Sequence, residues 1–399
     1  RPPRSTLFPY TTLFRSFVNP VAIKSLQSEW GSECISLLQH YFESVLKRIK
    51  SNDKASAINL LSALSERNEF HLGYSRGKSR GHGFGSISGS NVWKALSESK
   101  AAKSNLLTDL EDTCLLIEGI GPDMISDAVC NIIRGPLIAY TQEMCEYYEM
   151  PMENQVDSGP IWNPDEEKWE RTFVKLPVTT FGKLVLVPKI AVRFGMAYDV
   201  GEYYRYFLIP VMEQDEIKRK SELVETLKDG RKRVTTKELM KKYGAGKLSV
   251  VDQTVKRPEV LKRYKENKEK TPSRPLSHGD FAELEKIGSP NFEGFLDKVA
   301  SIPIGVENSA RYESAIEKLL TVMFYPSLCN PHKQHRIHAG RKRIDITYVN
   351  SAQKGFFDWL GRHYPASHIF VECKNYGQEV GNPEIDQLAG RFSPRDRKS

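Results

Sequence analysis

Hydrophobic positions in the last third of the chain recur with the periods of a helix and then of a strand. Apolar residues at helical spacing predict an amphipathic helix over 307–324, with a buried stripe of Ile316, Leu319, Leu320 and Met323. Strict alternation then predicts a strand over 343–349. Its core-facing side carries Ile344, Ile346 and Tyr348, and its opposite, polar side carries Asp345 and Thr347.

The alternation returns at 368–374, where a second strand is predicted with Ile369, Val371 and Cys373 toward the core. Aromatic residues around 356–360 indicate a short helix between the two strands. Asn382, followed by Pro383 and Glu384, is typical of a helix N-terminus. The buried stripe of that helix is predicted to be Ile385, Leu388, Ala389 and Phe392. From 276 onward the order is helix, strand, strand, helix, strand, helix.

The preceding region, 17–210, has the pattern of a mixed but mostly helical domain. Helical periodicity is clear over 34–49 and again over 132–148, whereas the β-branched run 183–192 predicts a strand. A glycine-rich stretch at 72–85 contains Gly77-Lys78-Ser79 but lacks the first glycine of a phosphate-binding loop, since Leu72 stands there. We therefore expect a flexible or substrate-covering loop.

Charged residues dominate 211–275, and the apolar positions there are too sparse to build a core alone. We predict charged helices and loops between two domains. The basic clusters at 218–220 and 231–233 leave two interpretations open, a solvated linker and a surface that follows DNA. Both ends of the chain resemble translated sequencing adaptor. We expect 1–16 to be a non-native leader, 17–210 an N-terminal domain of unknown role, 211–275 a charged helical linker and 276–399 a final domain that is truncated at its C-terminus.

Composition narrows the class of protein. The chain has 399 residues, 39% of them apolar, which is enough for two or three domains with real cores. We expect a cytoplasmic protein without a secretory signal or a membrane partner, since no apolar run has the length of a membrane span. The six cysteines have irregular spacing and form no CxxC pair, so buried free thiols are expected. The net charge of +8, part of it in the adaptor-like ends, permits nucleic-acid binding without demanding it.

The two predicted strands carry the chemistry. Glu372 and Lys374 lie two positions apart and therefore share one face of a mostly apolar strand, which is costly unless they line a functional cleft. If that strand pairs with 343–349, the β-carbons of Asp345 and Glu372 come within roughly 5 Å. Two carboxylates at that spacing suit Mg²⁺, which prefers oxygen ligands. Lys374 can then hold an attacking water or help to deprotonate it.

The runs RKRIDITYVN and IFVECKNY resemble the PD-(D/E)xK nuclease superfamily, whose fold is restriction-endonuclease-like. The resemblance covers only 276–395, and Ile344 stands where the motif has its nominal proline. It implies an α/β (α+β) mixed sheet flanked by helices. It also implies metal ligation by Asp345, Glu372 and the backbone carbonyl of Cys373, and catalysis by Asp345, Glu372 and Lys374. Assistance is implied from a glutamate on the first helix, with Glu313 the better match and Glu317 the weaker, and from Gln387 on the last helix.

Basic residues before the first motif, together with one on the last helix, are suited to phosphate contacts, although a solvated basic loop is an equal alternative. They are Lys333, Arg336, Arg341, Lys342, Arg343 and Arg391. Three histidines, at 332, 335 and 338, recur every three residues. That spacing on a strand-like segment does not favour a metal site.

These observations predict a magnesium-dependent endonuclease that hydrolyses DNA phosphodiester bonds, with Mn²⁺ as a substitute ion and DNA as partner. The resemblance implies a bacterial restriction or phage-defence role. Two alternatives stay open: a DNA-repair or recombination nuclease, and a module that senses nucleic acid without cutting it. A homodimer is also left open.

Overall fold

The computed structural model describes residues 16–26, 28–64, 67–70, 89–180, 182–285, 288–337, 342–364 and 366–389. Its class is α+β, with 55% helix and 14% strand, and its strands form small antiparallel sheets. The mixed class predicted from the sequence is therefore confirmed at this level. The predicted leader up to residue 15, the glycine-rich loop 72–85 and the adaptor-like C-terminal end lie outside the described residues.

The N-terminal part is mostly helical, as predicted. Its helices are α1 (Pro20–Lys24), α2 (Glu29–Lys50), α3 (Lys54–Ser62), η1 (Asn68–Phe70), α4 (Gly89–Glu98), α5 (Lys100–Lys103), α6 (Asp112–Leu116), α7 (Pro122–Ile132) and α8 (Arg134–Tyr147). The longest, α2, begins at the capping residue Ser28, whose hydroxyl accepts a hydrogen bond from Gly31 N–H. The apolar positions of α2 at helical spacing are buried, among them Leu38, Tyr41 and Val45.

Short strands complete this part of the molecule. They are β1 (Phe17–Val18), β2 (Glu153–Asp157), β3 (Ile161–Asn163), β4 (Lys168–Glu170), β5 (Phe173–Leu176), β6 (Val178–Thr179), β7 (Gly182–Lys183) and β8 (Val192–Arg193). All their pairings are antiparallel two-stranded ladders: β1 with β8, β2 with β5, β3 with β4 and β6 with β7.

The prediction of a continuous strand over 183–192 is wrong. Only its ends pair, in β7 and β8, and η2 (Lys189–Ala191) follows Pro188. Between them the backbone bonds to scattered partners: Val185 N–H donates to Glu69 O at 2.9 Å, and Leu186 N–H donates to the Thr141 hydroxyl at 2.8 Å. The apolar run is therefore buried by packing and not by a sheet.

The segment 211–275 is helical, as predicted, and its few apolar residues pack into a core while many of its charged side chains are exposed. Its elements, with those leading into it, are α9 (Val200–Tyr203), η3 (Tyr204–Leu208), α10 (Ile209–Lys218), β9 (Glu225–Thr226), β10 (Lys232–Arg233), α11 (Thr236–Tyr243), α12 (Lys247–Lys256) and α13 (Pro258–Lys270). One hydrophobic core runs from Val18 through α2 and α7 to Tyr264 of α13. The few apolar residues of this segment complete a core supplied mainly by the N-terminal helices.

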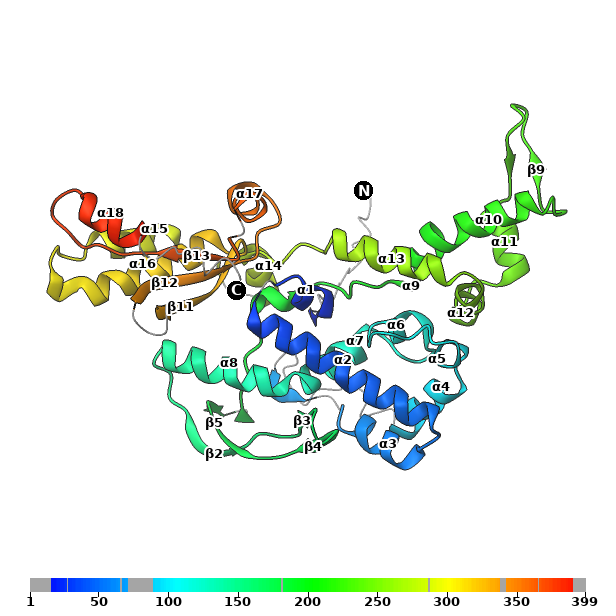
Figure 1. Cartoon of the computed structure of the whole chain (residues 1–399), viewed down its shortest axis with the longest axis horizontal. Coiled ribbons are helices and arrows are strands. Elements are labelled where there is room, and N and C mark those ends of the chain that lie inside the picture. Colours follow the sequence, from blue (N-terminus) through cyan, green and yellow to red (C-terminus); the bar gives the residue numbers. More distant parts are fainter. Residues whose placement is uncertain are drawn as a thin grey trace, which may run out of the picture.

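From Ser309 onward the C-terminal part follows the predicted order of elements, but two helices that were not predicted, α14 (His278–Glu285) and α15 (Phe292–Ala300), precede that point. After α15 and η4 (Val306–Asn308) come α16 (Ser309–Phe324), β11 (Leu328–Ile337), β12 (Lys342–Asn350), α17 (Gly355–His363), β13 (His368–Val371) and α18 (Asn382–Ala389). The three strands form one antiparallel sheet in the order β11-β12-β13. In Figure 1 this sheet and its helices lie at one end of the longest axis, and the β9–β10 hairpin lies at the other.

The sheet packs on both faces. Ile346 and Tyr348 are fully buried against α16, together with Leu328. On the other face, Cys329 and Val349 pack against Leu26 and Ile190 of the N-terminal part. Thr347, predicted to lie on a polar face, is consequently buried. Within the described residues, no helix is both long and apolar enough to cross a bilayer.

Candidate active site at the open end of the sheet

The two strands predicted to carry the chemistry do pair. β13 runs antiparallel to β12, with Ile346 opposite Val371 and Tyr348 opposite Ile369. Continuing that register by one residue sets Asp345 opposite Glu372. The predicted alternation is confirmed as well, because Ile369, Val371 and Cys373 pack toward the core that contains Ile346 and Tyr348.

β13 is shorter than the predicted strand 368–374, since it ends at Val371. The reason is visible in the next hydrogen bond. Cys373 N–H donates to the carboxylate oxygen Oδ2 of Asp345 at 2.8 Å instead of to a backbone carbonyl of β12. The side chain of Asp345 thus ends the ladder and fixes the backbone between Glu372 and Lys374.

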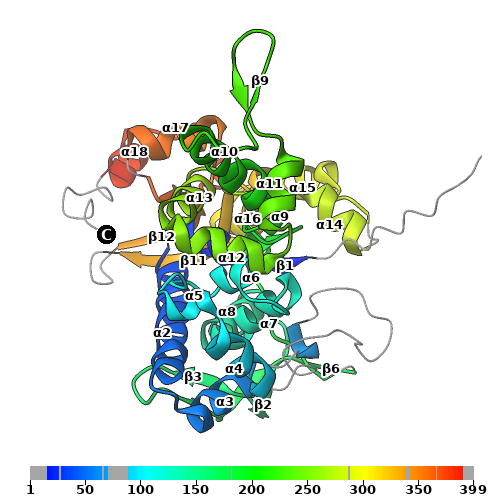
Figure 2. The ribbon, with the colours of Figure 1, turned by 90° about the vertical axis from the view of Figure 1, so that its right-hand side faces the viewer.

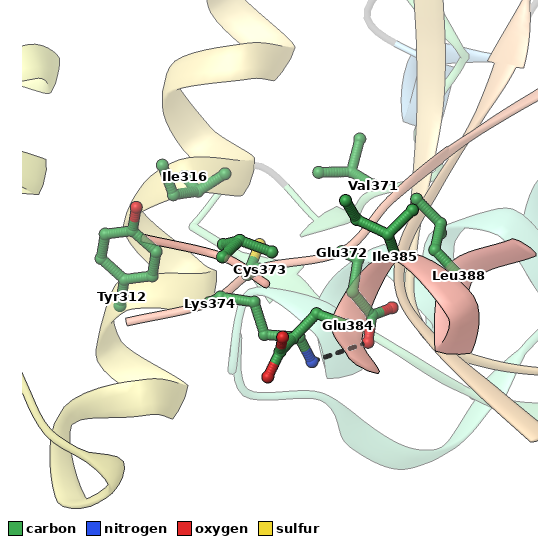
Figure 3. Close-up of a pocket in the computed structure, with 10 residues that line it drawn as sticks. Tyr312, Ile316, Val371, Glu372, Cys373, Lys374, Glu384, Ile385 and Leu388 are labelled. Carbon is green, nitrogen blue, oxygen red and sulfur yellow. Dashed lines mark hydrogen bonds and ion pairs between the residues drawn. The ribbon is translucent and has the colours of Figure 1, made fainter. Parts of the chain in front are cut away.

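Glu372 and Lys374 form an ion pair, with 3.2 Å between Lys374 Nζ and Glu372 Oε1. Their side chains are 10% and 20% exposed. Both line a cavity of about 320 Å³, shown in Figure 3, whose walls come from α16, from the chain after β13 and from α18. Its remaining lining residues are Tyr312, Ile316, Val371, Cys373, Val380, Glu384, Ile385 and Leu388. Asp345 is connected to this site by its hydrogen bond from the Cys373 N–H, and it does not line the cavity.

Carboxylates gather around the backbone that Asp345 holds. The pKa of the Cys373 thiol is raised to about 12, first by burial and then by the negative charges of Asp345, Glu313 and Glu372, while Lys374 opposes the shift. A site with three nearby carboxylates has a negative potential. Such a potential favours a cation and disfavours a bare phosphate group.

Glu313, the better of the two predicted assisting residues, lies near this cluster. Gln334 Nε2 donates to both of its carboxylate oxygens, at 2.7 and 2.8 Å. Burial raises the pKa of Glu313, the charge of Asp345 raises it further, and Lys333 and Arg343 act in the opposite direction.

Glu317, one turn along α16, is held elsewhere. It is fully buried, and its Oε1 accepts a hydrogen bond from the Thr321 hydroxyl at 2.8 Å. Its backbone carbonyl accepts from Tyr348 Oη at 3.0 Å. Glu317 therefore belongs to the packing of α16 on the sheet.

The donor atoms are of the kind that Mg²⁺ prefers, namely the carboxylates of Asp345, Glu372 and Glu313 and the carbonyl of Cys373. Each of the three side chains accepts a hydrogen bond from a protein partner. In the part of the chain that the structure describes, no three His, Cys, Asp or Glu side chains are gathered at the spacing of a metal site. The chemistry of the donor set fits the ion, and binding it requires the carboxylates to turn from their present partners.

The predicted phosphate-binding residues divide into two groups. Lys333 is engaged inside the protein: its Nζ donates to Ser314 Oγ at 3.0 Å and lies 4.7 Å from the centre of the Tyr147 ring on α8. It therefore joins three elements, contrary to the prediction that it contacts phosphate. Arg343 is exposed on β12. The side chains of Arg336 and Lys342, and the residues Arg341 and Arg391 entirely, lie outside the described part of the chain. So does the side chain of Gln387, which was predicted to assist catalysis.

Of the three histidines at 332, 335 and 338, only His332 has a described side chain. His332 Nδ1 lies 2.7 Å from Glu143 Oε1 of α8, and this ion pair raises the pKa of His332. The side chain of His335 and all of His338 fall outside the described residues. The thiols follow the prediction more closely: five of the six cysteines are buried and all are free, while Cys373 is partly exposed.

Sequence reasoning missed two residues near the site, Gln334 and Glu384. Gln334 lies opposite Asp345 in the register of β11 with β12, but its unusual positive φ of 56° and the bulge before it hide that position in the sequence. Glu384 lines the cavity and accepts a hydrogen bond from Gly381 N–H at 3.1 Å. Asn382, predicted to cap α18, is instead its first residue, and Glu384 accepts the N–H of Gly381, the residue before the helix. The place of Glu384 at the third position of the helix is the signal that could have found it.

Comparison with known proteins adds one finding. Residues 13–199, a little under half of the chain, match a family described as a domain of unknown function (DUF8370). No curated protein and no solved structure matches the chain. The candidate site lies outside the matched residues.

Proposed function

We propose that the C-terminal part is a magnesium-dependent nuclease of the PD-(D/E)xK type that hydrolyses DNA phosphodiester bonds. The observation that carries the proposal is the register of β12 and β13, which sets Asp345 opposite Glu372 and joins them through the Cys373 backbone. The succession of α16, β11, β12, α17, β13 and α18 follows the order of elements expected from the sequence and supports the proposal, whereas the described sheet is antiparallel throughout and not the mixed sheet that the resemblance implies.

Asp345, Glu372 and the carbonyl of Cys373 would hold Mg²⁺, with Mn²⁺ as a substitute. An ion bound there would lower the pKa of a water and would stabilise charge that develops on the phosphate. Lys374 stands beside Glu372 and can donate a hydrogen bond to a water or hydroxide near the scissile phosphate. Glu313, whose pKa burial raises above its ordinary value, is a candidate proton acceptor near this site. The setting that the resemblance implies is restriction or phage defence in a bacterial cytoplasm.

The test is cleavage of supercoiled plasmid with and without Mg²⁺, by the full chain and by three variants, Asp345→Asn, Glu372→Gln and Lys374→Met. Asparagine is chosen at 345 because its side-chain oxygen can still accept the Cys373 N–H, so charge is removed while the end of the ladder is kept. Alanine would leave that N–H without its acceptor, at a cost of about 1–3 kcal/mol. Exposed residues of the same part, changed as Glu379→Gln and Lys318→Met, provide matched controls.

We expect the full chain to nick or linearise the plasmid only with the metal, the site variants to lose at least about a hundredfold in rate, and the controls to retain it. Equal cleavage by any site variant would refute the assignment. Binding without cleavage in both Mg²⁺ and Mn²⁺ would favour the sensor alternative. Action confined to ends or branched substrates would favour a repair or recombination nuclease.

A further inference from the structure

The β9–β10 hairpin and α11 form a projecting unit, called here the basic arm and defined as residues 218–242. Figures 1 and 2 show the hairpin standing clear of the rest of the molecule. Its turn is tight: Gly230 N–H donates to Leu227 O at 2.9 Å, and Leu227 N–H donates to Arg231 O at 2.8 Å. Gly230 has a φ of +82°, a conformation that favours glycine.

The base of the arm is firmly attached. Val234 and Leu239 are buried in the main core. Glu216 of α10 accepts hydrogen bonds from Lys242 Nζ at 2.8 Å and from the Tyr243 hydroxyl. At the end of α11, Tyr204 Oη donates to Gly244 O at 2.6 Å. The arm therefore presents its outer side chains on a fixed frame.

Two of the four acidic residues of the arm form ion pairs within it, and its ten basic residues outnumber the acidic ones. Asp229 pairs with Arg231 at 2.6 Å, and Glu225 pairs with Arg233 at 3.5 Å. The exposed basic side chains outside these pairs lie on the end of α10, the hairpin and the outer face of α11. They are Lys218, Arg219, Lys220, Lys228, Lys232, Lys237 and Lys241.

The arm offers charge without apolar anchors. The nearest exposed large hydrophobic residues along the chain are Tyr206, before the arm, and Leu248, after it. The structure describes every residue from 207 to 247, and none of these is an exposed large hydrophobic residue. A protein interface is usually centred on buried aromatic or aliphatic anchors, and a membrane-bound helix inserts an apolar face. A surface that has cations and lacks both features fits a phosphodiester backbone best.

The adjoining helix α12 is excluded from such contacts. α11 and α12, joined by Gly244–Gly246, resemble a helix-turn-helix unit in which the second helix would read a groove. Here α12 packs on α5 and α6, as Figure 2 shows, and Val250 and Thr254 are buried. Lys247 Nζ donates to the carbonyls of Ile117 and Ile120 at 2.7 and 2.9 Å. Contact with nucleic acid is left to α11 and the hairpin.

We infer that the basic arm binds the backbone of duplex DNA without reading its sequence. The choice of DNA over RNA as the partner rests on the proposed function. The argument from the charges of the arm does not depend on the proposed function. The arm and the candidate active site lie toward opposite ends of the longest axis in Figure 1. The arm thus holds DNA away from the site of cleavage, and short duplexes that reach only the site lack its contribution.

The test measures the affinity of the full chain for a fluorescent 30-base-pair DNA duplex in EDTA, across a series of salt concentrations. The variant carries Lys228→Gln, Lys232→Gln, Lys237→Gln and Lys241→Gln together. A control variant carries the same change at four exposed lysines of the N-terminal part, namely Lys50, Lys94, Lys103 and Lys175. All substitutions are on exposed side chains, and matching melting curves check the folding of both variants. The same proteins are titrated with duplex RNA and with vesicles containing phosphatidylserine.

We expect the arm variant to bind DNA at least about tenfold more weakly, while the control stays near wild type. The log–log salt slope of the arm variant should be lower by about 0.9 for each phosphate group that it no longer neutralises. Equal affinity and slope for wild type and arm variant would overturn the inference. So would an equal weakening in the control, which would assign the effect to net charge.

The other two ligands distinguish the partner. Weaker vesicle binding with DNA binding unchanged would point to a lipid surface and overturn the inference. If the arm variant bound only RNA more weakly, RNA would replace DNA as the partner of the arm. The binding assay contains EDTA and therefore no free metal, so these outcomes do not depend on cleavage. Cleavage is tested separately with Asp345→Asn.

Discussion

Glu216 permits a quantitative prediction about the base of the basic arm. Its carboxylate lies on α10, is almost completely buried, and accepts hydrogen bonds from Lys242 and Tyr243 of α11. Its pKa is lowered from 4.5 to about 2, first by the hydrogen bond from Lys242 and then by those from Ser221 and Tyr243. The ionised form is therefore strongly preferred in the folded protein.

The sign and size of the effect follow from linkage. A carboxylate whose pKa is depressed in the folded state stabilises it above the unfolded pKa, and this contribution is lost as pH falls toward the folded pKa. At pH 7 a shift of this size corresponds to about 3 kcal/mol of unfolding free energy. By pH 3 it falls to about 1 kcal/mol, and at pH 2 little of it is left. Glutamine at 216 keeps the shape, lacks the charge and does not titrate.

The assay is urea unfolding followed by circular dichroism at several pH values, for wild type and for Glu216→Gln. We expect the variant to be less stable by about 2–3 kcal/mol at pH 7, with most of that gap gone at pH 3. Glu222→Gln, an exposed change on the same segment, should show almost no gap at either pH. A Glu216 gap that stays constant from pH 7 to pH 3 would refute the assigned cause, because only the ionised carboxylate can make it vary.

Three further predictions concern the candidate site and its surroundings. The double variant Glu372→Gln with Lys374→Met should cleave no more slowly than either single variant, since the pair acts as a unit; additive losses in plasmid cleavage would contradict this. Neutralising the basic residues 341–343 together should weaken DNA binding and lower its salt slope by about 0.9 for each phosphate group released; an unchanged slope would show that they point away from DNA. The raised pKa of His332 means that its pair with Glu143 stabilises the fold below pH about 6.5 and that this stabilisation is lost as pH rises through the folded pKa. The melting temperature of His332→Asn should accordingly differ from wild type more at pH 6 than at pH 8, and an equal difference would contradict the assigned pairing.

The sheet was the part of the fold most readily predicted from the sequence. Alternation alone assigned Ile344, Ile346 and Tyr348 to a core face, and all three are fully buried. The pairing of the two strands was a condition of the prediction and not a consequence of the pattern, and β12 and β13 meet that condition. The opposition of Asp345 and Glu372 needed no information beyond that register.

The buried stripes of the helices were predicted less well. Helical periodicity indicates which face of a helix is apolar, but it does not indicate how much of that face a neighbouring element covers. Met323, at the end of the α16 stripe, is 49% exposed, and Ile385 of α18 is 57% exposed. Ile385 lies instead at the wall of the cavity. Ala389 is also exposed, and Phe392 lies outside the described residues. In the same way, sparse apolar positions in 211–275 suggested a linker, but a few residues such as Leu239 and Tyr264 suffice when another domain supplies the rest of the core.

Burial of Thr347 shows why a polar-looking strand face could not be assigned from the strand itself. Thr347 pairs with His332 in the sheet, and His332 reaches Glu143 of α8. Two residues further along β12, Val349 packs against Leu26 of the N-terminal part. The N-terminal part thus covers this face up to Thr347. Asp345 is the next residue on that face, where the ladder ends on the Cys373 N–H. Contacts hundreds of residues apart therefore decide which of two alternating polar side chains is structural and which is left at the candidate site.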